Sequence, residues 1–242
     1  MVKAVLFDVG STLVLPRPDI DGVFFEMATL RGHSLAKEAV SACLGEVNDF
    51  YEKEYLRDGD FWCSPTGSVE IYLEMYRYLA HLLGLEHDAQ GIAHAVWEAY
   101  LKPQYWQVIS DVVPCLKSLR HEHLRLGIVS NWAPNLADLI RGLLLAPYFE
   151  SVIASADVGY RKPDPIIFEI ALERMGIAPE EALHVGDRPD VDGIGAQKAG
   201  IMPIIIDRTG AWQDCPFMRI GSLAELPGIA VQARSGRLPQ NR

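Results

Sequence analysis

Short runs of consecutive apolar residues recur along the chain and predict strands that are buried on both faces of a parallel sheet. The first run covers Lys3 to Phe7 and is followed by Asp8. Four more runs lie late in the chain, at residues 124–130, 151–155, 182–187 and 202–206. Apolar positions with a helical period separate them and predict helices over 112–121, 134–144, 164–175 and 191–199. This alternation predicts an α/β fold, with a doubly wound, Rossmann-like parallel sheet as its core.

Residues 16–107 interrupt this alternation and predict four or five helices with no convincing strand. The stretch holds 15 acidic and 7 basic residues, whereas the rest of the chain holds 17 and 15. It also holds 14 of the 22 aromatic residues, which we interpret as the core of a separate module, with single rings lining a pocket. We therefore expect an all-helical cap at 16–107, inserted into a sheet domain formed by residues 1–15 and 108–230. Residues 231–242 have three arginines and no acid, so we expect a disordered tail there.

The overall composition excludes several classes of protein. With 49% hydrophobic and 22% charged residues among 242, the chain is neither collagen-like nor disordered. A net charge of −10 argues against a nucleic-acid partner. The four cysteines form no C-x-x-C pair, which favours a reducing compartment. No apolar run approaches the ~18 residues that span a membrane, and the first residues do not resemble a signal peptide, so we expect a cytoplasmic protein without a membrane partner.

Polar side chains follow three of the predicted strands. Asp8 follows the first strand, Ser130 and Asn131 follow the second, and Asp187 follows the fourth. Each residue type taken singly is common at helix N-caps, turns or surfaces. The carboxyl ends of parallel strands, however, meet at one edge of the sheet, where ligands bind. Their order along the chain therefore favours one shared site.

Lys162, just before the helix that starts near Pro163, and Asp192, just beyond Asp187, complete the candidate site. Carboxylates that lie close together repel one another unless a cation sits among them, and oxygen ligands suit Mg²⁺. Asp8 is placed to act as nucleophile and metal ligand, and Lys162 to neutralise an incoming anion. Ser130 and nearby backbone N–H groups are suited to holding a phosphoryl oxygen.

These residues lie in segments that resemble the four motifs of the haloacid dehalogenase-like hydrolases, in the subgroup with a helical cap between motifs one and two. Residues 7–13 (FDVGSTL) are similar to the first motif and residues 129–131 (VSN) to the second. Residues 161–168 (RKPDPIIF) are similar to the third, and residues 185–192 (VGDRPDVD), continuing to Gly200, to the fourth. The resemblance covers residues 2 to about 206, while the cap matches by placement and helicity alone.

The resemblance implies a Mg²⁺-dependent hydrolase, in the first place a phosphatase for a small phosphorylated metabolite. Asp8 would become an aspartyl-phosphate. The implied metal ligands are Asp8, the backbone carbonyl of Gly10, and Asp187, with Asp192 supporting the metal or the lysine from behind. The implied substrate-binding residues are Gly10, Ser130, Asn131 and Lys162, of which Ser130 and Lys162 would also act in catalysis.

One position departs from the pattern of the family's phosphatases. They carry a second aspartate two positions after the nucleophile, which protonates the leaving oxygen, and here that position is Gly10. A general acid of this kind contributes about 10²–10⁴-fold to the rate. The chain is therefore interpreted as a weak phosphatase, as one that uses a good leaving group or another acid, or as a member of a different class.

Three other classes stay open. The 2-haloacid dehalogenases also lack this aspartate, but they are metal-free and replace the Gly-Asp of motif four, which this chain keeps as Gly186-Asp187. Phosphonoacetaldehyde hydrolases have a small residue at the position of Gly10 and use a lysine of the cap to form a Schiff base. The predicted cap of this chain offers Lys37, Lys53 and Lys102 for that role. The third alternative is a non-catalytic interaction protein built on the same scaffold.

Overall fold

The computed structural model describes residues 1–235, apart from the side chains of residues 58 and 59. Its main sheet has six parallel strands in the order β5-β4-β1-β6-β7-β8. The strands are β1 (Ala4–Phe7), β4 (Arg125–Ser130), β5 (Ser151–Ala154), β6 (Ala182–Gly186), β7 (Met202–Ile206) and β8 (Met218–Ile220). The first five coincide with the apolar runs. The edge strand β8 is not predicted because its three residues, Met-Arg-Ile, are too few to form a pattern.

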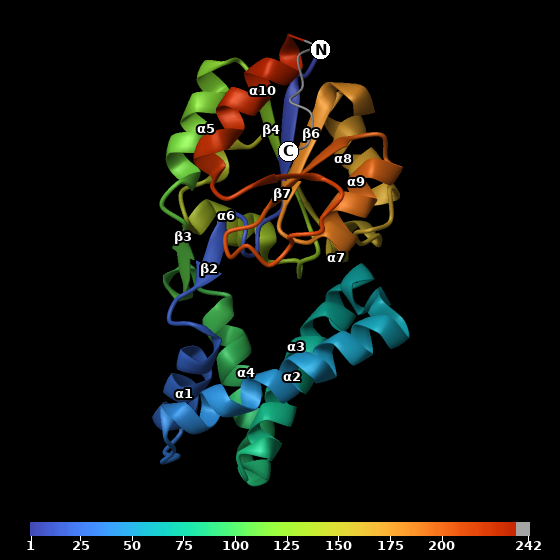
Figure 1. Cartoon of the computed structure of the whole chain (residues 1–242). Helices are drawn as coiled ribbons and strands as arrows, with labels where there is room; N and C mark the ends of the chain where they lie inside the picture. The colour runs from blue at the N-terminus through green and yellow to red at the C-terminus, as the bar shows by residue number, and fades with distance from the viewer. Residues whose placement is uncertain (236–242) are drawn as a thin grey trace.

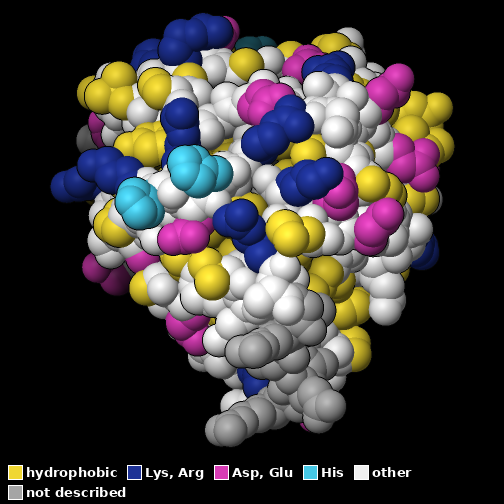
Figure 2. Space-filling model, turned by 90° about the horizontal axis from the view of Figure 1, so that it is seen from above, with side chains coloured by type: hydrophobic (Ala, Val, Ile, Leu, Met, Phe, Trp, Pro, Cys, Tyr) yellow, Lys and Arg dark blue, Asp and Glu magenta, His cyan; other side chains and the backbone are white. Residues whose placement is uncertain are grey.

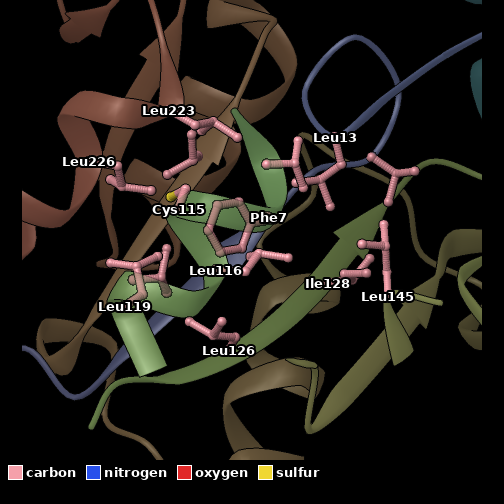
Figure 3. Close-up of a cluster of buried hydrophobic side chains, with 14 of the residues drawn as sticks. Phe7, Leu13, Cys115, Leu116, Leu119, Leu126, Ile128, Leu145, Leu223 and Leu226 are labelled. Atoms are coloured by element: carbon pink, nitrogen blue, oxygen red, sulfur yellow. The ribbon is translucent and has the colours of Figure 1, made fainter. Parts of the chain in front are cut away.

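Helices cover both faces of this sheet, which confirms the doubly wound α/β fold (Figure 1). One face packs against α5 (Val112–His121), α6 (Leu136–Gly142) and α10 (Leu226–Arg234). The other face packs against α8 (Ile166–Met175) and α9 (Ile194–Lys198), and the short α7 (Ser155–Val158) follows β5. Figure 3 shows the first interface, where Phe7 of β1 meets Leu116 and Leu119 of α5. Because both faces are covered, the central strand β1 is completely buried.

The segment between β1 and α5 leaves the sheet domain and forms a separate helical body (Figure 1). Its helices are α1 (Ile20–Leu30), α2 (Lys37–Asp58), α3 (Pro65–Leu82) and α4 (Ala89–Tyr100), and they enclose a hydrophobic cluster of their own. Phe24, Tyr76 and Tyr100 are buried in this cluster, as expected for a module with its own aromatic core.

A two-stranded antiparallel ribbon joins the two bodies. It consists of β2 (Val14–Pro16) and β3 (Trp106–Val108), where the helical segment leaves and returns. The sequence did not indicate these strands, because each has three residues and its partner lies about 90 residues away. The ribbon holds both ends of the inserted segment together at one point.

The C-terminal part differs from the expectation of a tail that starts at residue 231. Helix α10 continues to Arg234, since Leu226, Ala230 and Ala233 form one buried face that packs toward α5. Residues 236–242 of the expected tail lie outside the described residues. Within the described part of the chain, no helix is both long and apolar enough to cross a membrane. On the face turned away from the helical body, side chains of both charges are interspersed (Figure 2).

Candidate active site

The sheet order brings the strand-end residues together, because β1 lies between β4 and β6. Asp8 follows β1, Ser130 ends β4, and Asp187 follows β6. The Ser130 hydroxyl donates a hydrogen bond of 3.0 Å to Oδ1 of Asp8. The backbone N–H of Asp8 donates to the carbonyl of Val185, the last residue but one of β6, at 2.9 Å. The predicted nucleophile is thus held by both neighbouring strands.

Lys162 reaches the same carboxylate from the loop that precedes α8. Its Nζ lies 2.6 Å from Oδ1 of Asp8 and 2.6 Å from Oδ1 of Asp192, and the side chain is almost fully buried. Asn131 fixes the backbone of this lysine. Its Oδ1 accepts from the N–H of Lys162 at 2.7 Å, and its Nδ2 donates to the carbonyl of Lys162 at 3.0 Å. These contacts favour a positioning role for Asn131 over the direct substrate contact that we expected.

Asp192 is a buried anchor for the lysine. Oδ1 of Asp192 accepts from Lys162 and lies 2.9 Å from Nε2 of His184, while Oδ2 accepts from the backbone N–H of Arg188 at 3.1 Å. Burial raises the pKa of Asp192, but the charge of Lys162 and the hydrogen bonds of His184 and Lys162 outweigh burial and hold that pKa well below its usual range. A Cβ at Gly186 would lie only 2.1 Å from Cγ of Asp192, so glycine is required there.

His184 was not predicted as a site residue, because it lies within an apolar run, where the sequence pattern indicates only a buried strand. Its ring is completely buried, and among the described residues Nδ1 has no hydrogen-bond partner. Burial is the main reason why the pKa of His184 is lowered. The ring therefore supports Asp192 through Nε2.

Three carboxylates outnumber the one lysine at this site. Oxygens of Asp8, Asp187 and Asp192 lie within 4.8 Å of one another. Burial and the charges of Asp8 and Asp192 raise the pKa of Asp187 to about 8, against the opposing effect of Lys162. Burial also raises the pKa of Asp8. Because the donors are all oxygens and negative charge is in excess, the site fits a hard divalent cation such as Mg²⁺.

Asp8 and Asp187 have the carboxylates best suited to bind that cation. Both oxygens of Asp192 are already engaged by Lys162, His184 and a backbone N–H, so Asp192 lies behind the site. Gly10 lines the same cavity, and its carbonyl oxygen already accepts a hydrogen bond of 2.6 Å from the backbone N–H of Thr12.

A cavity of about 210 Å³ opens above these residues, between the sheet domain and the helical body. Its lining residues are Asp8, Gly10, Ser11, Tyr51, Tyr55, Ser130, Asn131, Trp132, Lys162, Asp187, Arg188, Val191 and Asp192. Tyr51 and Tyr55 come from α2 and cover the carboxylates from the side of the helical body. The cavity is smaller than the ~300–1,000 Å³ of typical ligand pockets, which favours a small ligand.

Two arginines connect the helical body to the site. The guanidinium of Arg161 lies 4.6 Å from the ring centroid of Tyr55 and donates to its hydroxyl at 2.7 Å. The guanidinium of Arg188 lies 5.8 Å from the same ring and donates to Glu52 of α2 at 2.9 Å. The sequence contained one usable signal for the arginines, because they directly adjoin Lys162 and Asp187.

Comparison with known proteins places this site in a family. The model of the haloacid dehalogenase-like (HAD) hydrolases matches residues 2–200. A glyceraldehyde 3-phosphate phosphatase of Methanopyrus kandleri is 32% identical over 223 residues, which are 88% of this chain and 87% of that protein.

Two solved structures resemble the chain over nearly its whole length. A HAD phosphatase from Thermococcus onnurineus is 28% identical with a TM-score of 0.63, and the match covers 94% of this chain and 97% of that one. A 2-haloacid dehalogenase from Pseudomonas syringae is 27% identical with a TM-score of 0.66, covering 97% and 100%. Since the family model spans more than half of the chain and agrees with the fold and the strand-end carboxylates, the protein belongs to the haloacid dehalogenase-like hydrolases.

Proposed function

We propose that this protein is a Mg²⁺-dependent phosphatase that hydrolyses a small phosphorylated metabolite through an aspartyl-phosphate at Asp8. The observation that carries this proposal is the environment of the Asp8 carboxylate. Ser130 and Lys162 both bind its Oδ1, whereas Oδ2 has no hydrogen-bond partner among the described residues. One oxygen is thus held in place, and the other is available to attack phosphorus.

The surrounding residues would act on the phosphoryl group. Oδ2 of Asp8 attacks phosphorus, and the bond from phosphorus to the leaving oxygen breaks. The charge of Lys162 and the hydroxyl of Ser130 stabilise the phosphoryl oxygens, because both are rigidly held in a buried site. Water then attacks phosphorus, the bond from phosphorus to Asp8 breaks, and phosphate leaves with the protons of the water, which restores the Asp8 carboxylate. The names of two relatives, a glyceraldehyde 3-phosphate phosphatase and a HAD phosphatase, support this class of reaction.

The metal would be held by Asp8, the backbone carbonyl of Gly10, and Asp187. When bound, Mg²⁺ neutralises the excess negative charge and screens the substrate phosphate from the Asp8 carboxylate. Asp192 keeps Lys162 oriented toward Asp8 through the 2.6 Å contact.

Residues 16–107 would serve as the cap of this site, and residues 1–15 with 108–230 as the catalytic domain. Contacts between the two bodies support this division. Tyr55 and Glu52 of α2 reach Arg161 and Arg188 at the rim of the cavity. A substrate enclosed beneath the cap would be shielded from bulk water.

A second candidate is hydrolysis of a carbon–halogen bond, which the likeness to a 2-haloacid dehalogenase favours. Halide leaves without a proton, so Gly10 is compatible with that reaction. Asp187 argues against it, because this half-buried carboxylate lies close to Asp8 and Asp192 and its charged form is disfavoured there unless a cation is bound. The phosphonoacetaldehyde alternative loses support, since Lys37, Lys53 and Lys102 do not line the described cavity. Lys37 is instead paired with Asp19 at 3.1 Å.

Release of phosphate from a panel of phosphorylated metabolites tests the proposal. The native protein should release phosphate in Mg²⁺ but not in EDTA, and Asp8→Asn should lose the activity while remaining folded. Asp138→Asn changes an exposed aspartate of α6 in the same way and should retain activity. Halide release from 2-chloropropionate is measured in parallel. Halide release without phosphate release would favour a dehalogenase instead of a phosphatase. Release of neither product by a folded native protein with Mg²⁺ would favour an interaction protein.

A further inference from the structure

The described lining of the cavity holds no side chain that is both unassigned and suited to act as a general acid. Among the described lining residues, the carboxyl groups are Asp8, Asp187 and Asp192, and each is assigned above to the nucleophile, the metal or the lysine. Burial raises the pKa of Tyr51 to about 12 and also raises the pKa of Tyr55. Gly10 has no side chain to donate. An alkoxide leaving group would therefore depart without a general acid.

Arg188 contributes a guanidinium to the lining of the same cavity. It directly follows Asp187, lines the cavity, and is about one-third exposed. Two carboxylates hold the guanidinium in place. Asp190 accepts from Nε at 3.1 Å and from Nη2 at 2.7 Å, and Glu52 accepts from Nη1 at 2.9 Å.

These contacts leave hydrogen-bonding capacity on the guanidinium. An arginine has five N–H donors and keeps its charge throughout the pH range of enzymes. The three bonds to Asp190 and Glu52 are all that the described residues accept from the Arg188 side chain, so two N–H groups remain for a ligand oxygen. A planar cation held in this way matches a departing carboxylate.

We propose that the substrate is a small acyl phosphate and that Arg188 binds the carboxylate that departs from it. This inference rests on the proposed phosphatase function and narrows its substrate class. The juxtaposition that carries it is a guanidinium, held by two carboxylates, that lines the same cavity as Asp8, where the described lining offers no unassigned carboxyl group. The cavity of about 210 Å³ suits a small acyl group.

The chemistry balances without a general acid. Oδ2 of Asp8 forms a bond to phosphorus while the bond between phosphorus and the acyl oxygen breaks, and that oxygen keeps the electron pair and departs as a carboxylate. In the second step, water attacks phosphorus and the bond to Asp8 breaks. Both protons of the water end on the released dihydrogen phosphate, so no protein group has to give or keep a proton.

Comparison of leaving groups tests the substrate class. The native protein should show a kcat/KM for acetyl phosphate that exceeds the value for glycerol 3-phosphate by at least about 10²-fold, the usual contribution of a general acid that only the alkyl ester needs. Pyrophosphate is a third arm, since its leaving group is an anion of different shape. Equal kcat/KM for the acyl and alkyl phosphates, both abolished in Asp8→Asn, would overturn this inference and leave the proposed phosphatase standing. Preference for pyrophosphate over acetyl phosphate would also overturn it.

Variants of Arg188 test its role. Arg188→Gln should lower kcat/KM for acetyl phosphate by about 10²-fold, the scale of one lost donor to a developing anion, and should lower it less for aryl phosphates, whose leaving charge is delocalised. Glu52→Gln removes the negative charge that ties Arg188 to α2 but keeps the guanidinium, and should preserve the ratio of kcat/KM between acetyl phosphate and an aryl phosphate. Arg141→Gln, at an exposed arginine of α6, serves as the matched control. An equal loss on all substrates in Arg188→Gln, reproduced by Glu52→Gln, would show that Arg188 only holds the cap.

Discussion

Restoring a carboxyl group at Gly10 provides the sharpest test of how this site handles its leaving group. The backbone permits the substitution, because Gly10 lies outside the left-handed region, and the strained residue of the loop is Ser11 with φ of 55°. A Cβ at Gly10 would meet Cζ3 of Trp132 at 3.6 Å, an ordinary van der Waals contact. Trp132 is itself buried and packs on Trp106 with ring centroids 5.1 Å apart, so the indole is confined on that side of the new side chain.

The expected gain follows from the chemistry of general acids. Such a group raises the rate by about 10²–10⁴-fold. We expect the lower end of this range for Gly10→Asp, because no residue of the native loop is placed to orient the new carboxyl group. A 10²-fold gain corresponds to about 2.7 kcal/mol of transition-state stabilisation. The surrounding carboxylates favour the acid form of a new carboxyl, as they do for Asp187, whose pKa they help to raise to about 8. The gain should appear with alkyl phosphates and be absent with acetyl phosphate, whose leaving group needs no proton.

The assay measures kcat/KM for glycerol 3-phosphate and for acetyl phosphate, and compares the native protein with the variants Gly10→Asp and Gly10→Asn. The asparagine has the same shape as the aspartate but cannot donate a carboxyl proton, so it controls for the changed volume beside Trp132. Folding and Mg²⁺ binding of both variants are checked first by thermal unfolding. A folded, Mg²⁺-binding Gly10→Asp that gains nothing over Gly10→Asn on the alkyl ester would refute the reasoning.

Three further predictions concern the metal, the core and an ion pair. Mg²⁺ at about 100 times its Kd should raise the Tm of the native protein by about 5 °C or more, and Asp187→Asn should abolish the shift, because one carboxylate ligand is lost; an equal shift in both would remove Asp187 from the metal site. Leu116→Ala should lower the free energy of unfolding by about 2–5 kcal/mol in a urea titration, since Leu116 is fully buried against the sheet, whereas Leu56→Ala, at a largely exposed position, should change it by less than about 0.5 kcal/mol. The Asp111 carboxylate accepts a hydrogen bond of 2.7 Å from Arg208. Burial raises the pKa of Asp111, but the hydrogen bonds from Arg208, Ser222 and the N–H of Leu223 outweigh burial and lower this pKa from 3.8. A lowered folded-state pKa stabilises the protein above pH 3.8, so the stability difference between native protein and Asp111→Asn should be constant at neutral pH and shrink as the pH falls below that value; a difference that grows on acidification would contradict the ion pair.

The sequence by itself determined the central strands and the residues that follow them. A strand covered on both faces needs consecutive apolar residues, and that requirement can be met and recognised within five or six positions. Asp8, Ser130 and Asp187 were predicted to meet because parallel strands end at one edge of the sheet, whatever their exact order. Lys162 and Asp192 were added to this set from their positions along the chain, and Lys162 does contact both Asp8 and Asp192.

The tertiary structure decided the features that depend on contacts between distant segments. The ribbon of β2 and β3 forms because the inserted helical segment leaves and returns at one point. A strand of three residues is too short to be recognised from its sequence pattern. His184 became a partner of Asp192 through the folding of the turn after β6, although its strand reads as purely structural. The amide of Asn131 turned to the backbone of Lys162, 31 residues away, because that backbone offers it both a donor and an acceptor.

The approach of α2 to the sheet domain is the clearest case. Tyr55 and Glu52 lie on a helix with a weak amphipathic pattern, more than 100 residues from Arg161 and Arg188. Local sequence encodes which residues prefer a helix or a strand and which face is apolar, because those preferences arise within a few turns or positions. The cavity is completed by charged and aromatic side chains from both the sheet domain and the helical body. Their meeting depends on how these two parts are held together, and that arrangement exists only in the folded chain.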